Sequence, residues 1–286
     1  MTEAPLATIS DLRITFPGRH VAVEAVRGVS FTLGREKLGI VGESGSGKSM
    51  TGRALMRLLP GSARMTAKEL RFGDTDLLTA SERQMCQLRG RHMAMILQDP
   101  KYSLNPVVTV GRQITETYLR HRRNNRREAR DYALRMLEAV KIRNPERVFG
   151  QYPHEVSGGM GQRIMIAMML VAEPSMLIAD EPTSALDVTV RFEIMQLLDE
   201  LIAQRHLGVL FISHDLNLVR RFCDRVLIMY AGQVVEEIEA DRLDEAQHPY
   251  TRGLLDSMPR IHSPRPRLPV LQRDPAWREA VAPVLT

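Results

Sequence analysis

The chain has 286 residues, a net charge of +5, 44% hydrophobic and 26% charged residues. This length suits one large domain, or one domain with a subdomain, and the composition is typical of a soluble globular protein. The longest apolar run, Ile164–Ala172, is about half the roughly 18 residues that a membrane-spanning helix needs. The N-terminus lacks the basic and apolar segments of a secretory signal, so the sequence predicts a cytoplasmic protein.

The first third of the chain is rich in predicted strands. Ala7–Phe16 and Val26–Leu33 alternate apolar and polar residues, which is typical of half-buried antiparallel strands. Lys37–Val41 is a short apolar run that predicts a buried strand. Ser49–Leu59 then predicts a helix that is stopped by Pro60.

The remainder continues the alternation of helices and strands. Thr109 to about Val148 has a helical, highly charged pattern. Further on, the sequence predicts two buried parallel strands, an amphipathic helix between them and a final hairpin: Ser175–Pro182, Gly208–Asp215, Val188–Arg205 and Arg225–Ile238. This order of elements favours an α/β fold. The tail after His248 is rich in Pro and Arg and is expected to be partly disordered.

Gly42–Ser49 matches the pattern G-x-x-x-x-G-K-[ST] between a predicted strand and a predicted helix, which is the context that identifies a phosphate-binding P-loop. Glycines allow backbone N–H groups to turn toward phosphate oxygens, and the helix N-terminus adds its positive dipole end. Lys48 supplies a charge for the β- and γ-phosphates, and Ser49 a hydroxyl for Mg²⁺. The predicted nucleotide contacts here are Gly42, Glu43, Ser44, Gly45, Ser46, Gly47, Lys48, Ser49 and Met50. The alternative is a flexible Gly/Ser loop.

Two carboxylates follow the predicted buried strand in "MLIADEP". Asp180 is placed to hold Mg²⁺, directly or through water, and Glu181 to polarise an attacking water molecule. The alternative interpretation of this pair is a cluster of helix-capping carboxylates.

With these two motifs, the chain resembles the ATP-binding subunit of an ABC transporter from about Ala7 to Pro259. The resemblance implies a P-loop ABC cassette over residues 1–245, with a RecA-like core, an antiparallel β-subdomain and a helical subdomain at about 105–170. Residues 246–286 would form a C-terminal extension of the oligopeptide-transporter type. ATP and Mg²⁺ are the implied cofactors.

The same resemblance assigns roles to single residues. Gln98 would reach the metal and water as the Q-loop glutamine, and His214 would be the switch histidine near the γ-phosphate. Asp187 closes the D-loop motif "SALD" and is expected to contact nucleotide. Phe16 fits the aromatic ring that stacks on adenine. A structural histidine and a core phenylalanine are the alternatives for His214 and Phe16.

The stretch "VSGGMGQR" resembles the ABC signature, which contacts the γ-phosphate of ATP held by another subunit. Ser157 would donate its hydroxyl, while Gly158 and Gly159 would let the foreign phosphate approach the backbone. One chain would therefore be incomplete without a second. Gly161 departs from the related sequences, which usually carry Arg or another long side chain there. We expect a slightly frayed helix start with no lost phosphate contact, and the role of Gly161 is open.

"QDPKYSLNPVVTVGRQI" and "HPYTRGLLDSMP" resemble the oligopeptide, dipeptide and nickel importer branch. The implied partners are a second, different ATPase, two transmembrane permeases and an extracytoplasmic substrate-binding protein, with this chain peripheral on the cytoplasmic face of the inner membrane. Peptides are the leading substrate, and nickel or a metal chelate is the alternative. No iron–sulfur cluster is expected, since the tail lacks a cysteine cluster.

Two rival classes remain. One is an ABC ATPase acting on nucleic acid, which the basic stretch Arg120–Arg130 allows; lipid head groups or a solvated helix face are other interpretations of that stretch. No sustained heptads and only one P-loop are present, so no nucleic-acid partner is expected. The other rival is a regulatory cassette that binds ATP without cleaving it, against which Glu181 and His214 argue.

Overall fold

The computed structural model describes residues 4–18, 21–98, 103–122, 125–257 and 274–278. The chain divides into two compact units, of which the first joins Met1–Ala80 to Leu210–Thr286 and the second is Ser81–Val209. Within the described ranges, no helix is long and apolar enough to cross a membrane.

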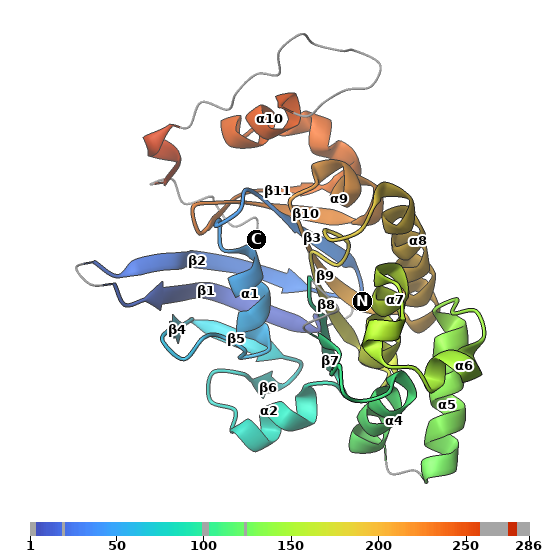
Figure 1. The fold of residues 1–286 in the computed structure, drawn as a ribbon. Coiled ribbons are helices and arrows are strands. Elements are labelled where there is room, and N and C mark those ends of the chain that lie inside the picture. Colours follow the sequence, from blue (N-terminus) through green and yellow to red (C-terminus); the bar gives the residue numbers. More distant parts are fainter. Residues whose placement is uncertain (1–3, 19–20, 99–102, 123–124, 258–273, 279–286) are drawn as a thin grey trace. The chain divides into compact units, whose positions relative to one another are not determined.

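The first unit contains an antiparallel sheet in the order β2-β1-β5-β6, with β4 also paired to β1 (Figure 1). Its strands are β1 (Ala7–Phe16), β2 (Val23–Leu33), β4 (Arg64–Thr66), β5 (Glu69–Phe72) and β6 (Thr75–Asp76). A register shift between Ile9 and Leu12 interrupts the alternation of β1, where Asp11 adopts a φ of 49°. The predicted pair of half-buried antiparallel strands is confirmed.

A second group of strands in this unit carries the phosphate-binding loop. β10 runs parallel to β3 and antiparallel to β11, and the turn between β10 and β11 uses positive φ angles at Ala231 and Gly232. The predicted hairpin is therefore confirmed. The elements are β3 (Lys37–Val41), α1 (Lys48–Leu55), β9 (Gly208–Ser213, whose first two residues belong to the second unit), α9 (Leu216–Phe222), β10 (Arg225–Tyr230) and β11 (Gln233–Glu239).

Helix α1 ends earlier than predicted. Its last residue is Leu55, and Arg57 follows in the left-handed region with a φ of 48°. The N–H of Arg57 donates to the carbonyl of Ala54, and the N–H of Leu58 donates to that of Arg53. These two bonds form a Schellman motif, which closes the helix four residues before Leu59. The prediction that Pro60 stops the helix is therefore wrong.

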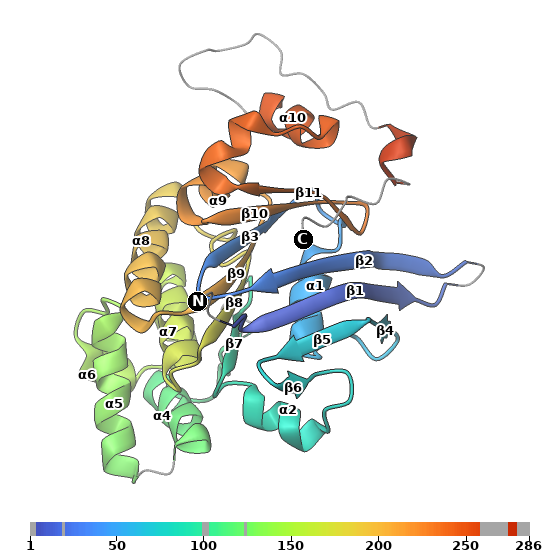
Figure 2. The ribbon, with the colours of Figure 1, turned by 180° about the vertical axis from the view of Figure 1, so that it is seen from behind.

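The C-terminal part of the first unit comprises three short helices: η2 (Ala240–Glu245), α10 (Pro249–Asp256) and η3 (Pro275–Arg278). α10 lies beside β11 in both views (Figures 1 and 2). Much of the tail for which partial disorder was predicted, residues 258–273 and 279–286, lies outside the described residues.

The second unit combines two parallel strands, β7 and β8, with a set of helices. Its elements are α2 (Glu82–Leu88), β7 (Met93–Ile96), α4 (Val110–His121), α5 (Arg126–Ala139), α6 (Pro145–Phe149), η1 (Pro153–Glu155), α7 (Gly158–Leu170), β8 (Met176–Asp180) and α8 (Val188–Arg205). All four residues of β7 and all five of β8 are buried, as parallel strands covered on both faces require. The predicted bounds of α8 are confirmed.

The basic stretch Arg120–Arg130 spans the end of α4 and the beginning of α5, with residues 123 and 124 outside the described part. Arg122 forms an ion pair with Glu173, and the guanidinium of Arg130 lies 5.4 Å from the centre of the Phe149 ring. Both contacts lie within the second unit. Part of the stretch is therefore used in packing its own helices.

Candidate functional site

The loop between β3 and α1 has the backbone of a phosphate-binding loop. Gly42, Gly45 and Gly47 adopt φ angles of 158°, 82° and 100°, which side chains rarely allow. A Cβ atom on Gly42 would lie 2.1 Å from the carbonyl oxygen of Met229. One on Gly47 would lie 2.4 Å from the carbonyl oxygen of Ala25. The neighbouring strands β10 and β2 therefore require glycine at both positions.

Several polar groups of this loop lack a partner within the protein. In the described part of the chain, the backbone N–H groups of Ser44, Gly45 and Gly47 donate no hydrogen bond, and the buried Oγ of Ser46 has none. α1 begins directly after Gly47, with no side-chain cap and no acidic residue in its first turn. An anion is the natural partner of such a set, because the helix dipole adds a positive end to unpaired N–H groups.

Lys48 is buried, and its ammonium group donates to the carbonyls of Gly42 at 2.9 Å and Glu43 at 2.8 Å. These bonds hold the cation over the loop that the glycines shape. The residues therefore fit a nucleotide phosphate, since the loop supplies both unpaired N–H groups and a fixed positive charge.

The other two predicted residues of the first unit lie at strand ends. Phe16 ends β1, opposite Val23 of β2, and its ring is half-buried. His214 follows β9 in a bend before α9 and is exposed. An exposed histidine at a strand end is not a core residue, and a half-buried ring retains a face for stacking.

The predicted carboxylates and Gln98 belong to the second unit and lie at or just after the carboxyl ends of its strands β7 and β8. Ile96 of β7 is the register partner of Ala179 of β8. Gln98 and Glu181 each follow that pair by two residues, at the carboxyl ends of neighbouring parallel strands. Both residues therefore belong to the segments that continue these two strands at the same edge.

Asp180 is buried with 4% of its surface exposed, whereas Glu181 is half-buried. Glu181 adopts a φ of 48°, an uncommon conformation for a residue with a side chain. Its carbonyl accepts hydrogen bonds from the backbone N–H and the hydroxyl of Ser184. This turn directs the chain from the strand into the predicted D-loop, with Asp180 enclosed and Glu181 accessible.

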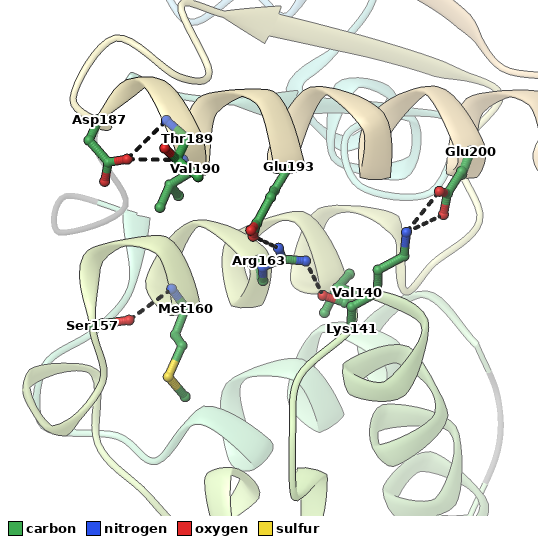
Figure 3. A network of polar contacts seen from close by, with 10 residues as sticks. All are labelled: Val140, Lys141, Ser157, Met160, Arg163, Asp187, Thr189, Val190, Glu193 and Glu200. Carbon is green, nitrogen blue, oxygen red and sulfur yellow. Dashed lines mark hydrogen bonds and ion pairs between the residues drawn. The ribbon is translucent and has the colours of Figure 1, made fainter.

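The signature stretch forms the first turn of α7 (Figure 3). Ser157 is the N-cap, and its hydroxyl accepts a hydrogen bond from the N–H of Met160 at 3.4 Å. The hydroxyl hydrogen stays available for donation to a further acceptor. The first intrahelical bond runs from the N–H of Gly161 to the carbonyl of Ser157 at 2.8 Å, so the departure at Gly161 leaves a regular first turn.

The two signature glycines differ in what they contact. A Cβ atom on Gly159 would lie 2.9 Å from Cγ1 of Val190, so the close approach of α8 requires glycine there. A Cβ atom on Gly158 would have no atom within 4 Å. Packing against α8 therefore accounts for the glycine at position 159. Gly158 is exposed, so a molecule outside the chain can approach its backbone.

Asp187 is the N-cap of α8, and its carboxylate accepts hydrogen bonds from the N–H groups of Thr189 and Val190 (Figure 3). The sequence alone assigned it to nucleotide contact. The structure gives it a definite role in starting the helix that contacts Gly159.

Gln162 is a residue of this site that the sequence motifs missed. It is 1% exposed, and its side-chain amide donates to the carbonyl of Pro182, the residue after Glu181. A polar side chain on an apolar helix, five residues after the N-cap serine, was the only signal in the sequence. This bond ties α7 to the turn that carries the carboxylates.

Among the residues that the structure describes, no three His, Cys, Asp or Glu side chains gather closely enough to hold a metal by themselves. Mg²⁺ usually takes one or two protein oxygens and completes its octahedron with phosphate oxygens and water. Ser49 in the first unit and the buried Asp180 in the second each carry an oxygen of the kind that Mg²⁺ binds.

The fold and these motifs define a P-loop nucleotide-binding protein, and comparisons with known proteins specify the family. The model of the ABC transporter family matches residues 26–184. The chain is 48% identical, over 92% of its length and 80% of the relative's, to "Probable peptide ABC transporter ATP-binding protein y4tR" of Sinorhizobium fredii. It is 46% identical, over 90% of its length and 73% of the relative's, to the oligopeptide transport ATP-binding protein OppD of Bacillus subtilis.

Among solved structures, the dimeric post-hydrolysis state of the ATP-binding cassette MJ0796, bound to ADP and Pi, matches with a TM-score of 0.73 at 25% identity. That match covers 82% of this chain and 98% of the other. The chain belongs to the ABC transporter family. The expected cassette fold, with an antiparallel sheet and a helical region, is confirmed.

Proposed function

We propose that this chain is the ATP-hydrolysing subunit of an ABC importer for peptides. The observation that carries the proposal is the identity of 45–48%, over at least 90% of the chain, to relatives named for peptide, oligopeptide and dipeptide transport. The phosphate-binding loop, the Asp180–Glu181 pair and the signature helix supply the parts that ATP hydrolysis needs.

Different residues of the chain bind the nucleotide and act on the attacking water. The N–H groups of Ser44, Gly45 and Gly47 and the ammonium of Lys48 bind phosphate oxygens and hold them in place. Glu181 accepts a proton from the attacking water, which Gln98 helps to orient. His214 donates a hydrogen bond toward the γ-phosphate, and the ring of Phe16 stacks on adenine.

Mg²⁺ would be held by Ser49 and Asp180, with Gln98 as a further ligand, and when bound it neutralises charge on the phosphate oxygens. Asp180 suits this role because its side chain is buried at the end of β8. The remaining loop contacts are those of Gly42, Glu43, Ser46 and Met50 with the same nucleotide.

The active unit is a pair of cassettes. Ser157 and Gly158 are exposed at the start of α7, where Ser157 caps the helix and a Cβ atom on Gly158 would meet no atom within 4 Å. Gly159 packs against Val190 of α8, the helix that Asp187 caps. We infer that the contacts with ATP bound to a second ATPase subunit are made by Ser157, Gly158, Gly159 and Asp187. In this branch of importers, the second ATPase subunit is a different chain. Two transmembrane permeases and an extracytoplasmic binding protein complete the importer, and the chain sits on the cytoplasmic face of the inner membrane.

The domain boundaries that we propose are those predicted from the sequence. They are a cassette over 1–245 with its helical subdomain at about 105–170, and an extension over 246–286. Helices α4 to α7 support the helical subdomain, since they occupy Val110–Leu170.

The test is transport by the reconstituted complex in proteoliposomes that contain MgATP. We expect uptake of a labelled tripeptide, and ATP hydrolysis that the tripeptide-loaded binding protein stimulates. Stimulation by a nickel-loaded binding protein with no response to the tripeptide would contradict the peptide assignment and favour metal import. ATP binding without any hydrolysis would contradict the enzymatic role itself.

A further inference from the structure

Tyr250, in the C-terminal helix α10, contacts the phosphate-binding loop. Its hydroxyl oxygen accepts a hydrogen bond from the backbone N–H of Glu43 at 3.2 Å, across 207 residues of sequence. The side chain is fully buried. Both residues belong to the first unit, and Glu43 is the second residue of the loop that starts at Gly42.

The residues around Tyr250 fix the direction of its side chain. His248 is the N-cap of α10, and its Nδ1 accepts a hydrogen bond from the N–H of Tyr250 at 3.1 Å. Pro249 occupies the first helical position, where its missing N–H removes no hydrogen bond. Within "HPYT", the histidine and proline therefore start the helix so that the tyrosine points at the loop.

Aromatic rings surround Tyr250 on its other sides. The ring of Tyr230, the last residue of β10, lies 4.5 Å away between centroids. The ring of Trp277, in η3, lies about the same distance from three members of the cluster: 6.0 Å from Tyr230, 6.0 Å from His248 and 6.1 Å from Tyr250. These rings form a cluster in which the hydroxyl of Tyr250 reaches the loop.

The hydrogen bond determines which way the loop's second peptide faces. The N–H of Glu43 is taken up by Tyr250, whereas those of Ser44, Gly45 and Gly47 donate no hydrogen bond in the described part of the chain. Lys48 holds the carbonyl of the same residue, Glu43, at 2.8 Å. Both ends of Glu43's backbone are therefore held, one by the loop's own lysine and the other by the C-terminal extension.

We propose that Tyr250 is a positioning residue for nucleotide binding, through which the C-terminal extension sets the shape of the phosphate-binding loop. The inference rests on the proposed function of that loop. Tyr250 acts through the Glu43 amide and does not touch the nucleotide.

Tyr250→Phe removes the hydroxyl and keeps the ring. The matched control is Tyr230→Phe, since Tyr230 is equally enclosed in the same cluster and its hydroxyl makes no hydrogen bond in the described structure. Trp277 is the only tryptophan of the chain, so its fluorescence reports on the cluster without a label.

The experiment is a titration of the full chain with MgADP, followed by calorimetry for affinity and by Trp277 emission for the response of the cluster. For wild type, we expect binding accompanied by a change in Trp277 emission. For Tyr250→Phe, we expect the Kd to rise about three- to tenfold, the range for loss of one hydrogen bond, and the emission change to shrink. For Tyr230→Phe, both quantities should stay at wild-type values. In the assembled ATPase, Tyr250→Phe should raise KM for ATP with little change in kcat.

Equal Kd values for the two variants would overturn this inference and leave the proposed function standing. Equal losses in both variants would also overturn it, because general packing of the rings would then explain them. A wild-type chain that does not bind MgADP would overturn the proposed function and this inference together.

Discussion

The side-chain amide of Gln162 in α7 donates a hydrogen bond to the backbone carbonyl of Pro182. Pro182 follows Glu181, so the helix that carries the signature is joined to the turn that carries the carboxylate. A displacement of α7 at Gln162 would therefore act on the residue next to the proposed catalytic base through a bond between buried groups.

Gln162→Leu should lower both stability and activity. The Pro182 carbonyl would lose its partner in a buried site, which typically lowers the free energy of unfolding by about 1–3 kcal/mol. We expect a lower kcat as well, since the position of Glu181 is no longer fixed from α7. Urea unfolding and steady-state ATPase assays of the assembled complex measure the two effects. The same substitution at exposed Gln204 is the control, and equal kcat values for the two variants would show that Gln162 is only structural.

The two signature glycines should respond in opposite ways to alanine. Gly159→Ala places a methyl group 2.9 Å from Val190, so overpacking should lower stability by about 1–3 kcal/mol. Val190→Ala, combined with it, should restore much of that loss. Thermal unfolding of the single and double variants checks this.

Gly158→Ala should change stability by less than about 1 kcal/mol, because the new methyl group meets no atom within 4 Å and alanine suits a helix better than glycine. It should nevertheless reduce ATP hydrolysis by the assembled pair about tenfold or more. The methyl group would keep the partner's phosphate away from the backbone N–H, and one hydrogen bond to a charged group would be lost. Full activity in Gly158→Ala would argue against an approach by the partner's nucleotide at this position.

The stability of the C-terminal helix should depend on pH through His248. Burial lowers the pKa of His248, and the nearby Glu236 acts in the opposite direction. The neutral ring accepts the hydrogen bond from Tyr250, so protonation removes the helix cap. Because the folded-state pKa is below the value of about 6.5 in the unfolded chain, the contribution is complete above pH 6.5. It is lost as the pH falls through 6.5 toward the folded-state pKa.

His248→Asn supplies a cap that does not titrate. Between pH 7.5 and 5.5, the wild-type Tm should fall by about 1–3 °C more than that of the variant, as loss of a cap worth about 1 kcal/mol predicts. His92 and His121, whose pKa values are also lowered by burial, titrate in both proteins and cancel in the difference. Parallel Tm curves would show that His248 does not report on this cap.

The sequence predicted those elements whose ends are encoded locally. Asp187 caps α8 and His206 closes it in the left-handed region, so both bounds of that helix were correct. The end of α1 was wrong because Arg57 forms a motif usually made by glycine. The short strands β4 to β6, together with α2 and β7, were not predicted, since two to seven residues are too few to display a period.

In the candidate site, too, the residues that a local motif encodes were predicted, and the contacts between distant residues were not. The residues of the phosphate-binding loop and the carboxylate pair follow from contiguous motifs. The bond between Tyr250 and Glu43 joins residues 207 apart, and the bond from Gln162 to Pro182 depends on how α7 packs. No local pattern encodes either contact, so only the structure reveals them.

ATP turnover by Glu181→Gln in the assembled complex measures whether Glu181 is the base that hydrolysis requires. Glutamine keeps the size and the hydrogen-bonding capacity of the side chain and cannot accept the proton of the attacking water. We predict that kcat falls by about 10²- to 10⁴-fold, with ATP still bound and the two ATPase subunits held together as a closed dimer. Turnover at the wild-type rate would contradict the assignment of Glu181 as the base and the account of hydrolysis built on it.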